Sequence, residues 1–208
     1  MNVLAIGAHF DDIELGCGGA LAKHSIKGDK VIVFIATSSE FSNKDGEVLR
    51  NSDVALEEAR RAGSQIGYRL LLGKIPTFQL EYGEEVQAKL LKIIEENKID
   101  LIYTHWTYDV HHDHRNLALA TLHVARHVNR VLMYRSNWYI SEKEFIENFY
   151  VDITDTWDIK ERAIREYKSE MQRVGDKWII YFRQEAINNG FKIGVKYAEA
   201  FQVVRWMI

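Results

Sequence analysis

One apolar run constrains the fold of this chain more than any other feature. Residues 30–36 read Lys-Val-Ile-Val-Phe-Ile-Ala, an almost unbroken hydrophobic stretch that ends in the polar residues 37–40. A strand that is buried on both faces has this composition, because helices cover both sides of the parallel sheet in which it lies. The run therefore predicts an α/β fold with a central, mostly parallel sheet.

The rest of the chain repeats an alternation of short apolar runs and helical patterns. Apolar runs predict further strands at 3–6, 68–72, 100–104, 130–134, 148–153 and 197–204. Apolar residues at helical spacing predict helices from 20 onward and at 50–66, 84–97, 115–127, 159–172 and 178–188, with a loop or linker at 41–48. This alternation indicates a Rossmann-like, doubly wound sheet with helices on both faces.

Length and composition exclude several classes of protein. A chain of 208 residues is long enough for one well-buried core, so we expect a single domain spanning 1–208. The net charge of −3 lacks the basic character of a nucleic-acid-binding domain. We find neither an apolar run of about 18 residues nor a secretory signal, and the single Cys17 has no disulfide partner. We expect a soluble, cytoplasmic protein, and a homo-oligomer remains possible.

Two polar clusters follow predicted strands. His9, Asp11 and Asp12 come directly after the first strand, and residues 111–114, His-His-Asp-His, follow the strand at 100–104. Ligands of open α/β sheets bind outside the carboxyl ends of the strands. We therefore interpret the two clusters as one site.

The residue types in these clusters are those of a catalytic metal centre. Zinc takes imidazole nitrogen and carboxylate oxygen, and a catalytic zinc keeps three protein ligands and one open position. His9, Asp12 and His114 supply such a set. Asp11, adjacent to a ligand but pointing elsewhere, is in place to act as the general base that takes a proton from the attacking water.

The remaining residues of the second cluster have auxiliary roles in this interpretation. His111 could stabilise the developing oxyanion or protonate the leaving amine, and Asp113 would hold the orientation of the His111 ring. Each residue alone has a simpler explanation, since loop histidines are mostly surface residues and Asp pairs often cap helices. The coincidence of a complete ligand set after two predicted strands favours the metal site.

Glycines 16, 18 and 19 raise the alternative of a dinucleotide-binding loop. The run Gly16-Cys17-Gly18-Gly19 does not match G-x-G-x-x-G, and Asp11, Asp12 and Glu14 would repel a pyrophosphate. We instead expect the glycines to permit a tight turn and to bring the following helix close to the sheet.

These motifs resemble those of a known family. Residues 4–23, LAIGAHFDDIELGCGGALAK, and residues 111–114 resemble the A-H-[PAx]-D-D and H-x-D-H motifs of the LmbE-like or PIG-L zinc-dependent deacetylases, and weaker likeness continues at 58–67, 160–170 and 197–201. The resemblance implies a Rossmann-like fold and removal of an N-acetyl group from a glucosamine-like amino sugar or its conjugate. It also implies the roles given above for His9, Asp11, Asp12, His114 and the pair His111 and Asp113.

The chain departs from the family pattern at three positions. Phe10 and His112 replace prolines found in many members, so the two loops are less constrained. Ala55 stands where many members have an arginine that contacts substrate, three residues before a helix glutamate. The residue that contacts substrate in its place is therefore open.

Candidates for substrate contact lie near the strand ends. Arg50, Arg115 or Arg135 could replace the missing arginine, and Arg135 is preferred because it follows a predicted strand. Trp106 and Trp138 flank polar strand ends and could stack on a sugar ring. For each of these residues the alternative is a structural role, as a surface arginine or a core aromatic residue.

Taken together, the sequence predicts a cytoplasmic, single-domain zinc N-deacetylase with a small amino-sugar substrate. A metal-dependent hydrolase of another amide or ester is an alternative, because a metal site does not determine the leaving group. A second alternative is a metal-containing carbohydrate-binding protein without turnover. Asp11 argues against it, since a binding site has no need of a carboxylate beside the metal.

Overall fold

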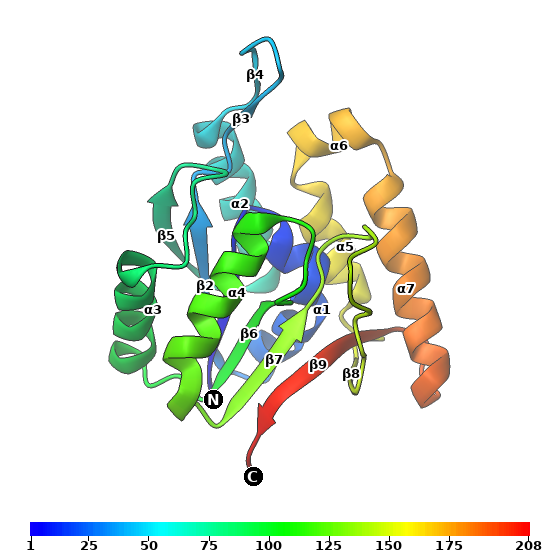
Figure 1. Cartoon of the computed structure of the whole chain (residues 1–208). Helices are drawn as coiled ribbons and strands as arrows, with labels where there is room; N and C mark the ends of the chain where they lie inside the picture. The colour runs from blue at the N-terminus through cyan, green and yellow to red at the C-terminus, as the bar shows by residue number, and fades with distance from the viewer.

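The computed structural model describes all residues, 1–208, and is built on a seven-stranded sheet with the order β5-β2-β1-β6-β7-β9-β8 (Figure 1). Five strands pair in parallel, namely β1 (Asn2–Gly7), β2 (Lys30–Thr37), β5 (Arg69–Ile75), β6 (Leu101–His105) and β7 (Arg130–Tyr134). The last two, β9 (Ala198–Trp206) and β8 (Phe149–Asp152), are antiparallel additions at one edge. This architecture confirms the predicted Rossmann-like, mostly parallel sheet.

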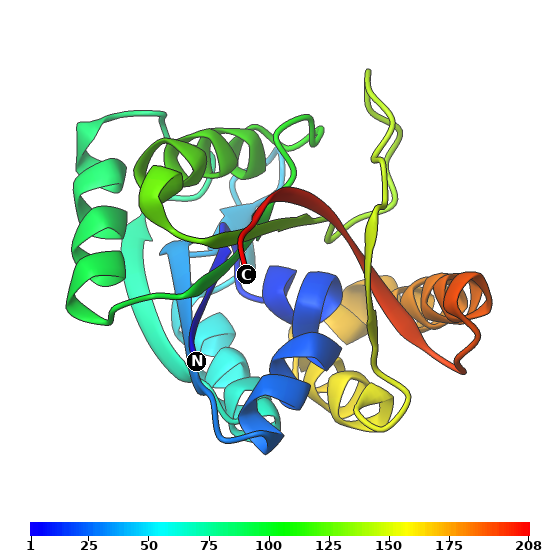
Figure 2. The ribbon, with the colours of Figure 1, turned by 90° about the horizontal axis from the view of Figure 1, so that it is seen from below.

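Helices cover both faces of this sheet (Figure 2). One face packs against α3 (Glu84–Glu96) and α4 (His112–Val124), which the 3-10 turn η1 (Ala125–His127) follows. The other face packs against α1 (Asp12–Ile26), α2 (Ser52–Ile66), α5 (Trp157–Arg165) and α7 (Lys177–Ile193), with α6 (Lys168–Val174) between the last two in the chain. Side chains along one strand point alternately to the two faces of the sheet, and each face packs against a hydrophobic layer of helices. This explains why β1 and β2 are apolar on both faces.

The strand order places the carboxyl ends of β1 and β6 at the position where ligands bind in such folds. The chain proceeds outward from β1 through β2 to β5, and then returns to β6 on the other side of β1. The crevice at such a reversal of strand order, at the carboxyl ends of the strands, is the usual ligand site of an open α/β sheet. The loops after β1 and β6, which carry both polar clusters, therefore meet at this crevice.

Three local predictions require correction. The region 159–172 forms two helices, because α5 ends at Arg165 and α6 begins at Lys168. The expected loop at 41–48 contains β3 (Phe41–Ser42), which pairs with β4 (Val48–Arg50) in a hairpin that projects from the domain in Figure 1. The first helix begins at Asp12, so the glycines lie inside α1 and form no turn.

The glycines nevertheless permit close packing, as expected. A Cβ atom at Gly16 would overlap the ring of Tyr134, and one at Gly19 would press on Ile153. The helix is interrupted between them at Cys17, whose φ of −145° and ψ of 15° are not helical. No helix of the chain combines the length and the apolar composition required to cross a membrane.

Candidate active site

A cavity of about 400 Å³ opens at the carboxyl ends of β1 and β6. Its lining comes from the loop after β1, the loop before α3, the beginning of α4, residues 136–139 and the α6 region. Six residues predicted for the site line it, namely His9, Asp11, Asp12, His111, His114 and Trp138. The volume falls within the range of small-molecule sites, roughly 300–1,000 Å³.

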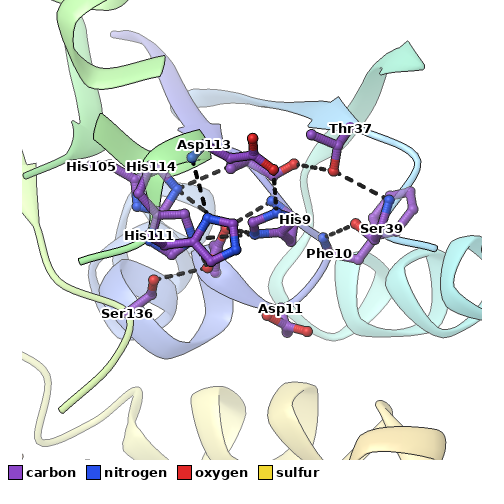
Figure 3. A network of polar contacts seen from close by, with 12 residues as sticks. His9, Phe10, Asp11, Thr37, Ser39, His105, His111, Asp113, His114 and Ser136 are labelled. Carbon is purple, nitrogen blue, oxygen red and sulfur yellow. Dashed lines mark hydrogen bonds and ion pairs between the residues drawn. The ribbon is translucent and has the colours of Figure 1, made fainter. Parts of the chain in front are cut away.

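The three predicted ligands line this cavity and bring their ligand atoms together in a compact group, the donor triangle, of which Figure 3 labels His9 and His114. His9 Nδ1 lies 3.1 Å from His114 Nε2. The Asp12 carboxylate approaches both rings, with Oδ1 at 3.3 Å from His114 Nε2 and Oδ2 at 3.4 Å from His9 Nδ1. Tetrahedral zinc with ligand bonds of about 2.0–2.1 Å separates its ligand atoms by about 3.3 Å. The separations of the two ring nitrogens from each other and from one Asp12 oxygen each are close to this value.

The outer nitrogen of each imidazole faces a buried carboxylate. His9 Nε2 lies 3.0 Å from Asp113 Oδ2, and His114 Nδ1 lies 3.2 Å from Asp109 Oδ2. A carboxylate in this position holds the ring proton on the outer nitrogen and leaves the inner nitrogen free to bind a metal. The inner nitrogens of both rings then face each other and the Asp12 carboxylate.

The carboxylates of Asp12 and Asp109 favour a positive charge at His114. Burial lowers the pKa of His114, but the charges of Asp12 and Asp109 outweigh burial and raise that pKa to about 10. His114 also belongs to two sets of adjacent metal-ligating side chains, one with His9 and His111 and one with Asp12 and His105. The residues therefore fit a divalent metal ion.

Asp113 orients a different histidine from the one expected. We predicted that its carboxylate holds the ring of His111, whereas it contacts His9 and accepts hydrogen bonds from the backbone N–H groups of Phe78 (2.9 Å) and Leu80 (3.3 Å). His111 caps α4 instead, and its Nδ1 accepts the backbone N–H of Asp113 at 3.2 Å. Asp113 therefore positions a predicted metal ligand, and only its backbone contacts His111.

Asp109 is a site residue that the sequence analysis missed. Its Oδ1 accepts the backbone N–H of His111 at 2.8 Å, and its Oδ2 accepts Asn137 Nδ2 at the same distance. Burial raises its pKa, but the contact with His114 outweighs burial and lowers the pKa to about 2. The available signal was an acidic residue two positions before the histidine cluster, in the loop after a strand.

His105 is the second residue that was missed. It is the last residue of β6, and its ring stacks on His114 with centroids 3.9 Å apart. Its Nε2 accepts the backbone N–H of Ala8 at 3.0 Å and lies 3.2 Å from Asp12 Oδ2. His105 therefore packs against the predicted ligands His114 and Asp12. The only indication of this role in the sequence was a histidine at the end of a buried strand.

Asp11 lines the cavity without joining the donor triangle, as expected. It precedes α1 with a φ of 99°, a conformation that turns its side chain away from the imidazoles in Figure 3. Its Oδ2 accepts a hydrogen bond of 2.7 Å from Arg50 Nη1. Burial raises the pKa of Asp11 to about 7, although the Arg50 guanidinium opposes the shift.

His111 is placed to donate a hydrogen bond into the cavity. Its ring centroid lies 4.6 Å from that of His9 and 4.8 Å from that of His114. Burial and the two neighbouring histidines lower its pKa to about 4, so the ring is neutral at pH 7. Since Nδ1 accepts the backbone N–H of Asp113, the single ring proton resides on Nε2.

The predicted substrate contacts are only partly brought to the cavity. Trp138 lines it, but Trp106 is buried and packs on Phe145 with ring centroids 5.5 Å apart. Arg135 lines a separate small cavity, and it donates to the backbone oxygen of Asn137 at 3.2 Å. Among the three candidate arginines, Arg50 is the one that lines the cavity.

Comparison with known proteins identifies relatives over most of the chain. The family model described as PIG-L: GlcNAc-PI de-N-acetylase matches residues 4–125. Diacetylchitobiose deacetylase of Thermococcus kodakarensis is 27% identical over 98% of this chain and 83% of its own length.

Solved structures share the fold. The N,N'-diacetylchitobiose deacetylase of Pyrococcus horikoshii has a TM-score of 0.84 at 24% identity, over 98% of this chain and 83% of that one. The 4-carboxy-2-hydroxymuconate hydratase GalB of Pseudomonas putida has a TM-score of 0.80 at 19% identity, over 100% of this chain and 98% of that one. The same fold thus supports more than one reaction.

Proposed function

This chain belongs to the PIG-L family of de-N-acetylases, and from that premise we propose that it is a metal-dependent N-deacetylase of a glucosamine-like amino sugar or its conjugate. The observation that carries the proposal is the donor triangle of His9, Asp12 and His114 beneath a cavity that also contains a carboxylate and a neutral imidazole. The relative from Thermococcus kodakarensis is named for an acetylated disaccharide, which makes chitobiose-like sugars the first substrates to test.

Zinc is the metal we propose, because two imidazoles and one carboxylate with an open fourth position form a common set of catalytic zinc ligands. When bound, zinc would polarise the amide carbonyl and make the attacking water more acidic. Asp109 and Asp113 would hold the two imidazoles in the orientation that this ion needs.

The residues around the triangle would carry the proton transfers and the charge of the transition state. Asp11 would accept a proton from the attacking water and deliver it to the leaving amine, since its carboxylate lines the cavity without joining the triangle. His111 would donate its Nε2–H to the developing oxyanion, a role that a neutral ring can perform.

Two other functions make different predictions. Hydrolysis of another amide or ester would use the same water activation on a different acyl compound, and the related fold of a hydratase illustrates how chemistry varies on this scaffold. A metal-containing carbohydrate-binding protein would not need the Asp11 carboxylate in its cavity. We favour the deacetylase because Asp11 and His111 supply an acid–base group and an oxyanion donor beside the triangle.

The deciding experiment measures acetate release from N-acetylglucosamine, N,N'-diacetylchitobiose and simple esters. The protein is stripped of metal, reloaded with zinc and assayed beside Asp11→Asn. Zinc-dependent release from the acetylated sugars that disappears in the variant supports the deacetylase. Faster hydrolysis of the esters supports the other hydrolase, and sugar binding without any release supports the binding protein.

A further inference from the structure

Phe78 combines backbone strain with exposure at the edge of the candidate active site. It lies in the loop between β5 and α3, and 56% of its surface is exposed. Its φ of 66° falls in the left-handed region that bulky side chains rarely adopt. Strained residues of this kind persist where the surrounding structure holds them, and they gather at functional sites.

Four hydrogen bonds fix this loop to the first turns of α4. The backbone N–H of Phe78 donates to Asp113 Oδ2 at 2.9 Å, and its backbone oxygen accepts His112 Nε2 at the same distance. The backbone N–H of Leu80 donates to Asp113 Oδ1 at 3.3 Å, and its oxygen accepts Asn116 Nδ2 at 2.8 Å. The backbone that carries the exposed ring is therefore fixed.

The ring lies beside the reacting centre. Phe78 lines the cavity and stacks on His111, with ring centroids 5.4 Å apart and an angle of 25° between the planes. His111 in turn lies 4.6 Å from the ring of His9, a predicted metal ligand. One ring thus separates Phe78 from the donor triangle, and the part of a substrate that carries the scissile amide must lie within its reach.

Four other aromatic residues line the cavity, namely Phe41, Trp138, Tyr139 and Trp178. The Phe41 ring lies under the Arg173 guanidinium, and Tyr139 packs on Trp138 with centroids 5.9 Å apart. Trp138 packs on Tyr181 with centroids 5.2 Å apart, and Trp178 is almost fully buried. None of the four has a ring contact with a histidine of the site, in contrast to Phe78.

We propose that Phe78 is a specificity-determining residue whose ring stacks on the apolar face of the pyranose that carries the acetamide. A pyranose presents a face of C–H groups, and an exposed aromatic ring is the side chain best suited to cover it. This inference rests on the proposed deacetylase function and deepens it, because it selects cyclic amino sugars over open-chain acetamides.

Kinetics on N,N'-diacetylchitobiose test the inference. Phe78→Ala and Phe78→Leu are expected to raise KM about three- to tenfold with little change in kcat, since an aromatic stacking contact has this magnitude. Phe78→Tyr and Phe78→Trp should keep KM near the wild-type value. Phe191→Ala, which removes a phenylalanine that is 80% exposed on α7 and does not line the cavity, is the matched control.

A binding measurement separates this inference from the proposed function. Calorimetry of N,N'-diacetylchitobiose with zinc-loaded Asp11→Asn protein, with and without Phe78→Leu, needs no turnover. If no sugar is deacetylated but Phe78→Leu weakens binding, the proposed function is wrong and the inference stands. If the wild type is active and Phe78→Leu changes neither affinity nor KM, or if the sugar does not bind at all, the inference is overturned.

Discussion

His9 Nδ1 and His114 Nε2 face each other at 3.1 Å, and the outer nitrogen of each ring lies against a carboxylate. His9 lies in the loop after β1, and His114 lies in the first turn of α4, about a hundred residues later in the sequence. The two meet because β1 and β6 are neighbours in the sheet. The facing nitrogens repel each other unless one of them carries a proton or both bind a metal ion, and Asp12 beside them favours either positive charge.

Removal of metal should destabilise the protein. A ligand that binds the native state at a hundredfold excess over its Kd stabilises it by about 2.7 kcal/mol. For a chain of this length, that energy corresponds to a shift of the thermal midpoint by roughly 5–10 °C. We expect a chelator to lower the midpoint in differential scanning fluorimetry by this amount and zinc to restore it.

Two histidine variants show whether the stabilisation arises at the triangle. His114→Asn should give a midpoint that no longer responds to zinc. His127→Asn, which changes an exposed histidine of η1, should respond as the wild type does. Equal responses of both variants to zinc would place the metal elsewhere.

The carboxylates behind the two histidines should tune the affinity for metal. Asp109→Asn and Asp113→Asn keep the size of the side chain but remove the charge that orients each ring, and such losses weaken metal binding about 10–100-fold. Competition with a chromophoric zinc chelator measures the effect. Asp45→Asn, at an exposed loop position, is the control, and unchanged affinity in both site variants would contradict the assigned roles.

The meeting of the predicted ligands was predictable because their positions follow directly from the strand ends. His9 and Asp12 lie just after β1, and His114 lies in the first turn of the helix that follows β6. The strand order then brings them together. Asp109 and His105 were missed because their roles depend on which atoms they face, and a loop aspartate or a strand histidine has no distinctive spacing.

The residues predicted to contact substrate were harder to assign from the sequence, for the same reason. Arg135 and Ser136 both follow β7, yet Ser136 donates to Asp12 at 2.8 Å while Arg135 points to another cavity. Successive side chains leave an extended chain in opposite directions, so a shift of one residue reverses the assignment. The direction of Trp106 likewise follows from core packing, which the sequence alone did not determine.

Asp11→Asn should abolish most turnover while it leaves the metal in place. Removal of a general base reduces kcat about 10²–10⁴-fold, and the amide can still accept the hydrogen bond from Arg50. Steady-state deacetylation and zinc content are measured on the same preparation. Asp12→Asn is the matched comparison, because it should lose zinc as well as activity. If Asp11→Asn loses zinc too, Asp11 is a metal ligand and the base lies elsewhere.

A buried ion pair holds α1 where the helix is interrupted. After the irregular residue Cys17, the backbone N–H groups of Gly19 and Ala20 donate to the Glu199 carboxylate at 2.9 and 2.7 Å. Lys160 Nζ donates to the same carboxylate at 2.6 Å. Glu199 on β9 thus caps a helix end that would otherwise be buried without acceptors.

Removal of this carboxylate should therefore be among the more destabilising single changes in the chain. Glu199→Ala leaves the charge of Lys160 buried without a partner, which costs about 3–5 kcal/mol in the free energy of unfolding measured with urea. The double variant Lys160→Met with Glu199→Gln should recover part of this loss, because no buried charge is left unpaired and an oxygen still accepts from the helix. Glu85→Gln, which breaks an exposed pair with Lys89, should change stability by less than about 1 kcal/mol. If Glu199→Ala is no more destabilising than Glu85→Gln, the cap does not stabilise α1.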